Sequence, residues 1–376
     1  MKNYLLGCDW GTSSFRLRLI NMPDHQLIGE IISPEGVASI FTSWKTDQER
    51  HGVSRAQFFR QQLKRQVELL ATKVAIDLTA VSIVISGMAS SSIGMDEVPY
   101  ASLPFPIDGS RTRIKRLPAQ TDFPHDILLL SGVQTKHDVM RGEETQLIGL
   151  LGLLATSDVA VDEAILLFPG THSKHIYVQN QQVTDFQTFM TGEVFNLMAH
   201  ASILKDSVEP TELHPFLDDE QQAFRSGVQA GSTSSILNSL FSVRTNQLFN
   251  KLNKKQNALY LSGLLIGSEL KTLTEQKHRP LLLCSGNHLY ELYKLALDVL
   301  HLAERTLPVS ADLLDKATIA GQVKIEKMIT SLFRKIRRQS SSVSPGRVLL
   351  SGGCRVRDRR WWRRPSTLIF RVVDRW

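Results

Sequence analysis

Residues 4–20 read YLLGCDWGTSSFRLRLI, and this stretch decides the fold. An apolar run reaches Asp9, the chain turns through residues 11–14, and apolar residues then alternate with polar ones from Phe15 onward. This pattern predicts a strand, a tight turn and a second strand. The N–H groups and hydroxyls of a small-residue tip can bind a phosphate, and a neighbouring carboxylate can hold Mg²⁺ through water. Because an ordinary hairpin would use the same residues, the other motifs must decide between the two interpretations.

The bulk composition indicates a soluble protein with room for two domains. A chain of 376 residues can bury two separate cores, and none of its apolar runs approaches the length that spans a membrane. The first residues lack the apolar stretch of a signal peptide. The three cysteines are few and not in metal spacing, which favours a reducing compartment. We therefore expect a cytoplasmic protein without a membrane partner.

The net charge of +7 is unevenly distributed. Residues 334–376 contain 12 Arg, 1 Lys and 2 Asp, a net charge of +11, so the rest of the chain carries −4. The body of the protein therefore lacks the basic footprint of a nucleic-acid binder. A nucleic-acid role is suggested only by the Arg/Trp-rich tail, and we expect no nucleic-acid partner.

A possible substrate loop follows the first long helix. Residues 26–33 predict a third strand, and residues 54–76 carry a helical apolar stripe. Residues 81–85 then predict a buried strand that ends in Ser86-Gly87-Met88. Ligands bind at the carboxyl ends of strands in α/β sheets, so this loop is a candidate substrate contact, although it could be a simple turn. Residues 103–126 have the composition of irregular surface.

An acidic helix start is the predicted seat of a general base. After a strand at residues 127–130, the chain carries Asp138, Arg141, Glu143 and Glu144 where a helix begins. Acidic residues there also compensate the helix dipole, which is the alternative explanation. One Arg among three carboxylates at the mouth of a strand–loop–helix unit favours acid–base chemistry.

A second hairpin repeats the design of the first. Residues 165–168 and 175–178 predict two strands, and the tip between them reads PGTHSK. A third strand at 183–189 continues the meander. The polar residues 157–163, which precede the hairpin, suit a hinge. Two hairpins with Gly-Thr tips suggest two related domains that face one nucleotide.

The remainder of the chain is predicted to be mostly helical. A helix follows Thr191, the expected N-cap, and residues 219–275 form helices with small-residue turns at 226–235 and 261–268. A strand at 281–283 runs into Gly286, where the backbone can approach a flat ligand closely. A last helix covers residues 311–338.

Five motifs resemble those of a known family. The resemblance covers roughly residues 4–322. They are DWGTSSFRLRL, ISGM…EVPY, DVMRGEETQ, LFPGTHSKHI and FMTGEVF. The chain resembles the 2-dehydro-3-deoxygalactonokinase family of the sugar kinase and actin superfamily. The resemblance implies an α/β fold of two ribonuclease H-like (actin-like ATPase) domains with an ATP cleft between them. We expect domains at 1–157 and 158–338, and a basic tail at 339–376 that does not resemble the family. Because the tail is dense in Arg, we expect residues after about 345 to be poorly packed, although the strand-like 348–353 could add an edge strand.

The resemblance also implies an activity and a set of site residues. Such a kinase phosphorylates 2-dehydro-3-deoxy-D-galactonate at its 6-hydroxyl with ATP and Mg²⁺, in galactonate catabolism. The first phosphate loop falls on Gly11, Thr12 and Ser13, with Asp9 as the magnesium anchor. The second phosphate loop falls on Gly170, Thr171, His172, Ser173 and Lys174. The adenosine motif falls on Gly286. Glu143 occupies the place of the catalytic base, with Glu144 and Asp138 as alternatives.

The substrate contacts and the overall activity keep alternatives. Arg16 and Arg141 could pair with the substrate carboxylate or form structural salt bridges, and Ser86, Gly87 and Met88 are the other expected substrate contacts. The rival functions are a kinase for another sugar or sugar acid and a non-catalytic actin-like ATP-binding protein. The sequence leaves the oligomeric state open.

Overall fold

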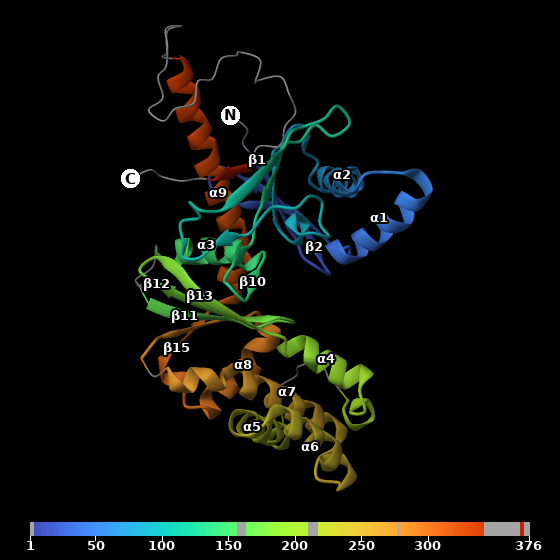
Figure 1. The fold of residues 1–376 in the computed structure, drawn as a ribbon, viewed down its shortest axis with the longest axis vertical. Coiled ribbons are helices and arrows are strands. Elements are labelled where there is room, and N and C mark those ends of the chain that lie inside the picture. The colour runs from blue at the N-terminus through green and yellow to red at the C-terminus, as the bar shows by residue number, and fades with distance from the viewer. Residues whose placement is uncertain (1–3, 156–162, 210–216, 277, 342–368, 372–376) are drawn as a thin grey trace. The chain divides into compact units, whose positions relative to one another are not determined.

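The computed structural model describes residues 4–155, 163–209, 217–276, 278–341 and 369–371 (Figure 1). The chain forms two compact units. The first comprises Met1–Gln134, Val139–Thr156 and Lys316–Trp376, and the second comprises Thr135–Asp138 and Ser157–Asp315. The expected domain boundaries remain a prediction. The compact units differ from them in grouping the residues from Lys316 onward with the first unit.

The sheet of the first unit is built on the predicted opening hairpin. Its strand order is β16-β7-β8-β4-β1-β2-β3. The strands β1, β2 and β3 form an antiparallel meander, and β4 and β8 continue the sheet parallel to β1. Their bounds are Tyr4–Trp10 (β1), Phe15–Asn21 (β2), Leu27–Ser33 (β3), Ile83–Gly87 (β4), Arg113–Leu117 (β7), Ile127–Leu130 (β8) and Ile369–Arg371 (β16). Short strands lie at Ala101–Ser102 (β5), Phe105–Pro106 (β6), Val133–Gln134 (β9) and Val139–Met140 (β10).

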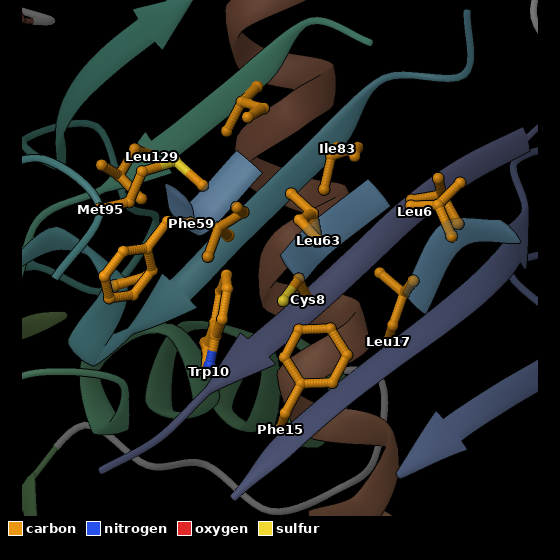
Figure 2. Packing of buried hydrophobic residues seen from close by; sticks show 14 of the residues in the cluster. Leu6, Cys8, Trp10, Phe15, Leu17, Phe59, Leu63, Ile83, Met95 and Leu129 are labelled. Carbon is orange, nitrogen blue, oxygen red and sulfur yellow. The ribbon is translucent and has the colours of Figure 1, made fainter. Parts of the chain in front are cut away.

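Helices cover both faces of this sheet (Figure 1). Helices α1 (Val37–His51) and α2 (Arg55–Val74) pack on one face, where Phe59 and Leu63 join Leu6, Cys8 and Trp10 in a buried cluster (Figure 2). Alternate residues of β1 point to the opposite face. Helices α3 (Glu143–Leu154) and α9 (Ala311–Ser341) cover that side.

The crossing of α3 and α9 depends on the absence of side chains at glycines. A Cβ added at Gly149 would lie 1.8 Å from the carbonyl oxygen of Ala317, and one added at Gly321 would lie 2.0 Å from that of Thr145. The two backbones are therefore in direct contact. Because the obstacles are main-chain atoms, repacking of side chains cannot relieve the overlap.

The second unit repeats the order of five strands of the first, β8-β4-β1-β2-β3. Its strands run β15-β14-β11-β12-β13, with β11, β12 and β13 as an antiparallel meander and β14 and β15 parallel to β11. Their bounds are Glu163–Phe168 (β11), Ser173–Gln179 (β12), Gln182–Phe189 (β13), Leu281–Cys284 (β14) and Thr306–Val309 (β15). The helices are α4 (Thr191–Ala201), α5 (Asp218–Thr233), α6 (Ile236–Leu248), α7 (Lys254–Leu270) and α8 (Asn287–Val299). Apolar residues of α5, α7 and α8 form the core with β11, β12 and β14.

The expected turn at 261–268 is wrong, and the one at 226–235 is confined to Ser234 and Ser235, between α5 and α6. Residues 226–233 and 261–268 lie inside α5 and α7, where Gly227, Gly231, Gly263 and Gly267 line the contact between the two helices. A Cβ at any of these four glycines would lie 2.0–2.3 Å from a backbone oxygen of the other helix. The glycines thus permit close packing and do not end the helices.

Three further expectations need correction, and one helix was not anticipated. The irregular surface expected at 103–126 contains β7, a strand of the main sheet, and α1 was not anticipated. Thr191 is the first residue of α4, and its hydroxyl donates to Glu269 instead of capping the helix. In the tail, expected to be poorly packed after about residue 345, Ile369–Arg371 forms β16 beside β7. The other tail residues from 342, including the strand-like 348–353, lie outside the described residues.

Gly149→Ala should destabilise the protein by about 2 kcal/mol, because the added methyl group meets the backbone of α9. Gly152→Ala on the same helix is the matched control. Its Cβ would approach only the Lys324 amine, at 3.8 Å, so alanine should stabilise the helix by about 0.5–1 kcal/mol. Chemical denaturation of both variants measures the difference, and equal stabilities would contradict the close crossing.

Candidate functional site

The first hairpin tip is closed by its own backbone and leaves its side chains exposed. Gly11 donates its N–H to the carbonyl of Ser14 over 2.9 Å, which fixes the turn between β1 and β2. Thr12 and Ser13 are exposed. The three residues expected to bind phosphate therefore lie on a defined turn, and the hydroxyls of Thr12 and Ser13 are accessible.

The start of α1 holds this tip from behind. Val37 and Ala38 donate their N–H groups to the carbonyls of Gly11 and Thr12, over 2.9 and 3.1 Å. A Cβ at Gly36 would lie 2.2 Å from the Thr12 carbonyl oxygen, so only glycine fits there. The first N–H groups of a helix have no partner within the helix, and here the tip carbonyls accept them.

The second tip has the same construction in its own unit. Glu193, in the first turn of α4, donates its N–H to the carbonyl of Thr171 over 3.1 Å. A Cβ at Gly192 would lie 2.8 Å from both the Gly170 carbonyl oxygen and Thr171 Cα. Each meander therefore leads into a helix whose start, with a glycine in contact, supports the tip.

The residues of the second tip divide into exposed and buried ones. Thr171 and His172 are exposed, and the His172 imidazole pairs with the carboxylate of Glu193. Ser173 and Lys174 are buried, and the Lys174 amine lies 3.4 Å from the His172 carbonyl oxygen. Only the outer part of the predicted loop is thus directly accessible.

Residues far apart in the sequence meet around Asp9. The parallel pairing of β1 and β4 places Asp9 beside Ser86 and Trp10 beside Gly87. A Cβ at Gly87 would lie 3.4 Å from Asp9 Oδ1, and one at Gly142 would lie 3.3 Å from Gly87 Cα. Both glycines have positive φ, +88° and +111°, which other residues rarely adopt. The predicted metal anchor, the substrate loop and the start of α3 therefore converge.

The Asp9 carboxyl has a raised pKa, mainly because it is removed from water. The positive charges of Arg16 and Arg18 lower this pKa, and the negative charge of Glu143 raises it. Arg16 is exposed on β2 directly opposite Asp9, and Arg18 forms a 3.1 Å ion pair with Glu30. A divalent cation at this place would favour the ionised form of both carboxylates.

The two glutamates at the start of α3 have different environments. Glu144 is buried, and its carboxyl oxygens accept the Gly142 N–H over 2.7 Å and the Thr145 hydroxyl over 3.0 Å. Burial and the neighbouring Glu143 charge raise the pKa of Glu144 to about 7. Glu143 is only half-buried, and one of its oxygens accepts the Arg141 N–H over 3.0 Å. Of this pair, Glu143 is the one that a substrate could reach.

The third candidate base, Asp138, lies in the second unit. Its carboxylate accepts the N–H and the hydroxyl of Thr188 over 2.6 and 2.8 Å. These bonds attach the segment Thr135–Asp138 to the end of β13. The structure thus gives Asp138 an anchoring role within the second unit.

Arg141 braces the loop that follows β4. Its guanidinium donates to the Ser90 carbonyl over 2.8 Å, to the Ser90 hydroxyl and to the Val98 carbonyl over 3.3 Å. It also lies 4.1 Å from the centre of the Tyr100 ring. The same group was expected to pair with a substrate carboxylate. Its observed bonds shape residues 88–100, which include the half-buried Met88.

Sequence reasoning missed a glutamine beneath this site. The buried Gln322 of α9 donates through Nε2 to the Cys8 carbonyl and to the Ser86 hydroxyl, both over 2.9 Å. Ser86, expected to contact substrate, is itself buried and held in this network. A single Gln in a helical stripe gives no signal of its own. The absence of a side chain at Gly7 opposite it was the available hint, since a Cβ there would lie 2.3 Å from Gln322 Oε1.

The predicted adenosine motif is open to solvent. Gly286 precedes the first residue of α8, is exposed, and has no neighbour within 4 Å of an added Cβ. Its φ of −69° is ordinary, so glycine here provides space and not an unusual backbone. A flat ligand could lie directly on the peptide.

The carboxylates at and near Asp9 are of the kind that magnesium prefers. Within the described ranges, no cluster of three or more His, Cys, Asp or Glu side chains could hold a metal by itself. Magnesium usually takes one or two carboxylates together with water and substrate phosphates. Asp9 could supply such a carboxylate, and Glu143 lies near enough for its charge to raise the pKa of Asp9.

Two units that share the order of five sheet strands, each with a helix-supported Gly-Thr tip, define a protein of the actin-like ATPase and sugar kinase class. Comparison with known families identifies one family within this class. The family model described as 2-keto-3-deoxy-galactonokinase matches residues 9–325. The chain belongs to the 2-keto-3-deoxy-galactonokinase family.

Individual relatives agree with this membership. A 2-dehydro-3-deoxygalactonokinase of Escherichia coli (strain K12) is 33% identical over 198 residues, 51% of this chain and 61% of that protein's length. A protein of Rhizobium meliloti (strain 1021) assigned the same name is 33% identical over 71% of this chain and 79% of its own. A solved structure of that description from Sinorhizobium meliloti is 29% identical, with a TM-score of 0.66 over 86% of this chain and 96% of its own. The expected family and α/β fold class are confirmed. The comparisons support the expected kinase function and do not favour the alternatives.

Glu144 should make stability depend on pH. Because burial raises its pKa to about 7, the folded protein holds this proton more tightly than the unfolded chain, whose pKa is near 4.5. This stabilisation is complete below pH 4.5 and is lost as the pH rises through 7. From pH 5 to 8 the wild type should lose roughly 2–3 kcal/mol relative to Glu144→Gln. Denaturation at both pH values measures this difference, and parallel pH profiles would contradict the buried acid.

Proposed function

We propose that this chain transfers the γ-phosphoryl group of ATP to the 6-hydroxyl of 2-dehydro-3-deoxy-D-galactonate, in galactonate catabolism. The family match over residues 9–325 carries this proposal. The convergence of Asp9, Gly87 and Glu143 in the first unit supports it, because phosphoryl transfer needs a cation anchor and a base at one place.

We assign Glu143 as the base that accepts the proton of the substrate hydroxyl. A base must reach the hydroxyl, and Glu143 is the half-buried carboxylate at the start of α3. Glu144 has a pKa near neutrality, but its carboxyl is buried and bonded to Gly142 and Thr145. Asp138 is committed to Thr188. Accessibility therefore favours Glu143.

Each tip is assigned to phosphate binding within its own unit. Thr12, Ser13, Thr171 and His172 are exposed and can offer N–H groups or polar side chains to phosphate oxygens. Ser173 and Lys174 are buried, so we assign them to support of the second tip. Gly286 is assigned to the adenosine, for which the open space over its Cα leaves room.

Asp9 is assigned as the magnesium anchor, through water. When bound, the ion supplies positive charge that neutralises the phosphate oxygens. Arg16, exposed beside Asp9, is assigned to the carboxylate of the sugar acid. Arg141 shapes the substrate loop from Ser90 to Val98.

We also assign the reaction to the cytoplasm. Cys8 and Cys284 are buried free thiols, which suits a reducing compartment. None of the helices in the described ranges combines the length and the apolar character that a membrane crossing requires.

A coupled ATP-turnover assay over a panel of acceptors tests the function. The panel contains 2-dehydro-3-deoxy-D-galactonate, its gluconate epimer and neutral sugars. We expect the galactonate derivative to give the highest kcat/KM, with the phosphate on the 6-hydroxyl by phosphorus NMR. Preference for a neutral sugar would indicate another sugar kinase, and ATP binding without transfer would indicate a non-catalytic protein.

Glu143→Gln should lower kcat by roughly 10²–10⁴-fold, because the amide keeps the size of the side chain but cannot accept a proton. Glu144→Gln and Asp138→Asn are the matched controls. They remove carboxylates with structural partners and should alter stability more than kcat. A full loss of kcat in either control, with Glu143→Gln active, would transfer the base to that residue.

Asp9→Asn should raise the magnesium concentration for half-maximal activity by roughly 10–100-fold, because an outer-sphere carboxylate is lost. Asp77→Asn, at an exposed carboxylate of the same unit, is the control and should leave it unchanged. Titration of activity with magnesium gives the result. A wild-type magnesium profile for Asp9→Asn would exclude the anchor.

A further inference from the structure

A buried polar cluster lies behind the second tip and has no part in the assignments above. Glu269 of α7 is only 3% exposed, and its Oε2 accepts the Tyr293 hydroxyl over 2.7 Å and the hydroxyl of Thr191. Its Oε1 lies 3.2 Å from His175 Nε2. These partners come from α8, from the first residue of α4 and from β12. We call Glu269, Tyr293, Thr191, His175 and Ser173 the Glu269 cluster.

The shortest contacts of the cluster fit one order of its hydroxyl protons. Burial and the Glu269 charge raise the pKa of Tyr293 well above its usual value, so its hydroxyl keeps its proton. That proton goes to Glu269, so the Tyr293 oxygen is free to accept from the Ser173 hydroxyl, 3.0 Å away. The other acceptor of the Ser173 hydroxyl, the Gly170 carbonyl oxygen, lies farther away, at 3.4 Å. Ser173 Oγ in turn accepts the N–H of Gly170 over 3.3 Å. A directed chain of hydrogen bonds therefore leads from the tip to the buried carboxylate.

His175 fits the same order as a neutral ring. With its proton on Nε2 it donates to Glu269, which leaves Nδ1 as an acceptor. Nδ1 is buried and has no hydrogen-bond partner among the described residues. An unpaired buried acceptor costs less than an unpaired buried N–H would. Glu269 thereby receives three donors, from three separate elements.

We propose that the Glu269 cluster is a positioning device for the second phosphate tip. Through Tyr293 and Ser173, Glu269 fixes the Gly170 peptide, and through Thr191 it fixes the start of α4, whose Glu193 N–H holds Thr171. The Gly170 N–H is turned inward, so the phosphate contacts fall on Thr171 and His172. This inference rests on the proposed function, in which the tip binds ATP.

Tyr293→Phe removes one hydroxyl from the chain and keeps the ring in the core. Tyr177→Phe is the matched control, because Tyr177 belongs to the same hydrophobic cluster and its hydroxyl accepts from Gln276 over 3.2 Å. Tyr293→Phe should raise the KM for ATP roughly ten-fold, the effect of one lost hydrogen bond, and leave the KM for the sugar acid unchanged. It should also speed amide hydrogen exchange in residues 170–174. Tyr177→Phe should match the wild type in both.

Ser173→Ala and the double variant provide the second measurement. If Ser173 and Tyr293 act in one chain, the double variant should be no worse than Tyr293→Phe alone. Losses that add up in the double variant would overturn the proposal. So would exchange rates and KM values of Tyr293→Phe that equal those of Tyr177→Phe. Exchange is read without ATP, so a wild type inactive on every acceptor would refute the proposed function, while tip exchange would still decide the positioning role.

Discussion

The structure depends on the support that each hairpin tip receives from the helix that follows its meander. In the first unit, the N–H groups of Val37 and Ala38 reach the tip carbonyls, and in the second the N–H of Glu193 does so. Tip carbonyls that are engaged from behind cannot turn toward a phosphate. The positive ends of the helix dipoles lie close to both tips, which favours an anion there. The same arrangement thus occurs in both units, which share the order of five sheet strands.

The convergence around Asp9 depends on a second constraint, the stacking of Gly87 and Gly142. These residues are 55 positions apart in the chain, and both have positive φ. A side chain on Gly87 would meet the carbonyl oxygen of Trp10 at 2.7 Å. The glycines therefore let the substrate loop and the start of α3 approach the end of β1, which brings Glu143 under the electrostatic influence of Asp9.

Much of this arrangement could be predicted from the sequence, because hairpins and phosphate tips are encoded locally. The alternation after Phe15 and the repeat at PGTHSK sufficed for the strand order near each tip. The errors arose where tertiary contacts decide. Glycines 227, 231, 263 and 267 promote turns in isolation, yet here they serve a helix pair. The charged β7 lacks an apolar run, and Gln322 acquires its role only through the fold. Likewise, only the structure shows that Glu143 is accessible and that Glu144 is buried.

The close pairing of α5 and α7 has a consequence for the depth of Glu269. Gly263 and Gly267 hold the backbone of α7 against α5, and Glu269 follows two residues later on the same helix. The separation of the two helices is set by main-chain contact, which is nearly incompressible, and not by side chains that can adopt other rotamers. This contact works as a spacer of fixed thickness. A methyl group added at any of the four glycines would overlap a backbone oxygen of the other helix, so α5 and α7 could not keep their present separation. The missing side chains at these glycines therefore determine where Glu269 lies relative to its partner His175 in β12.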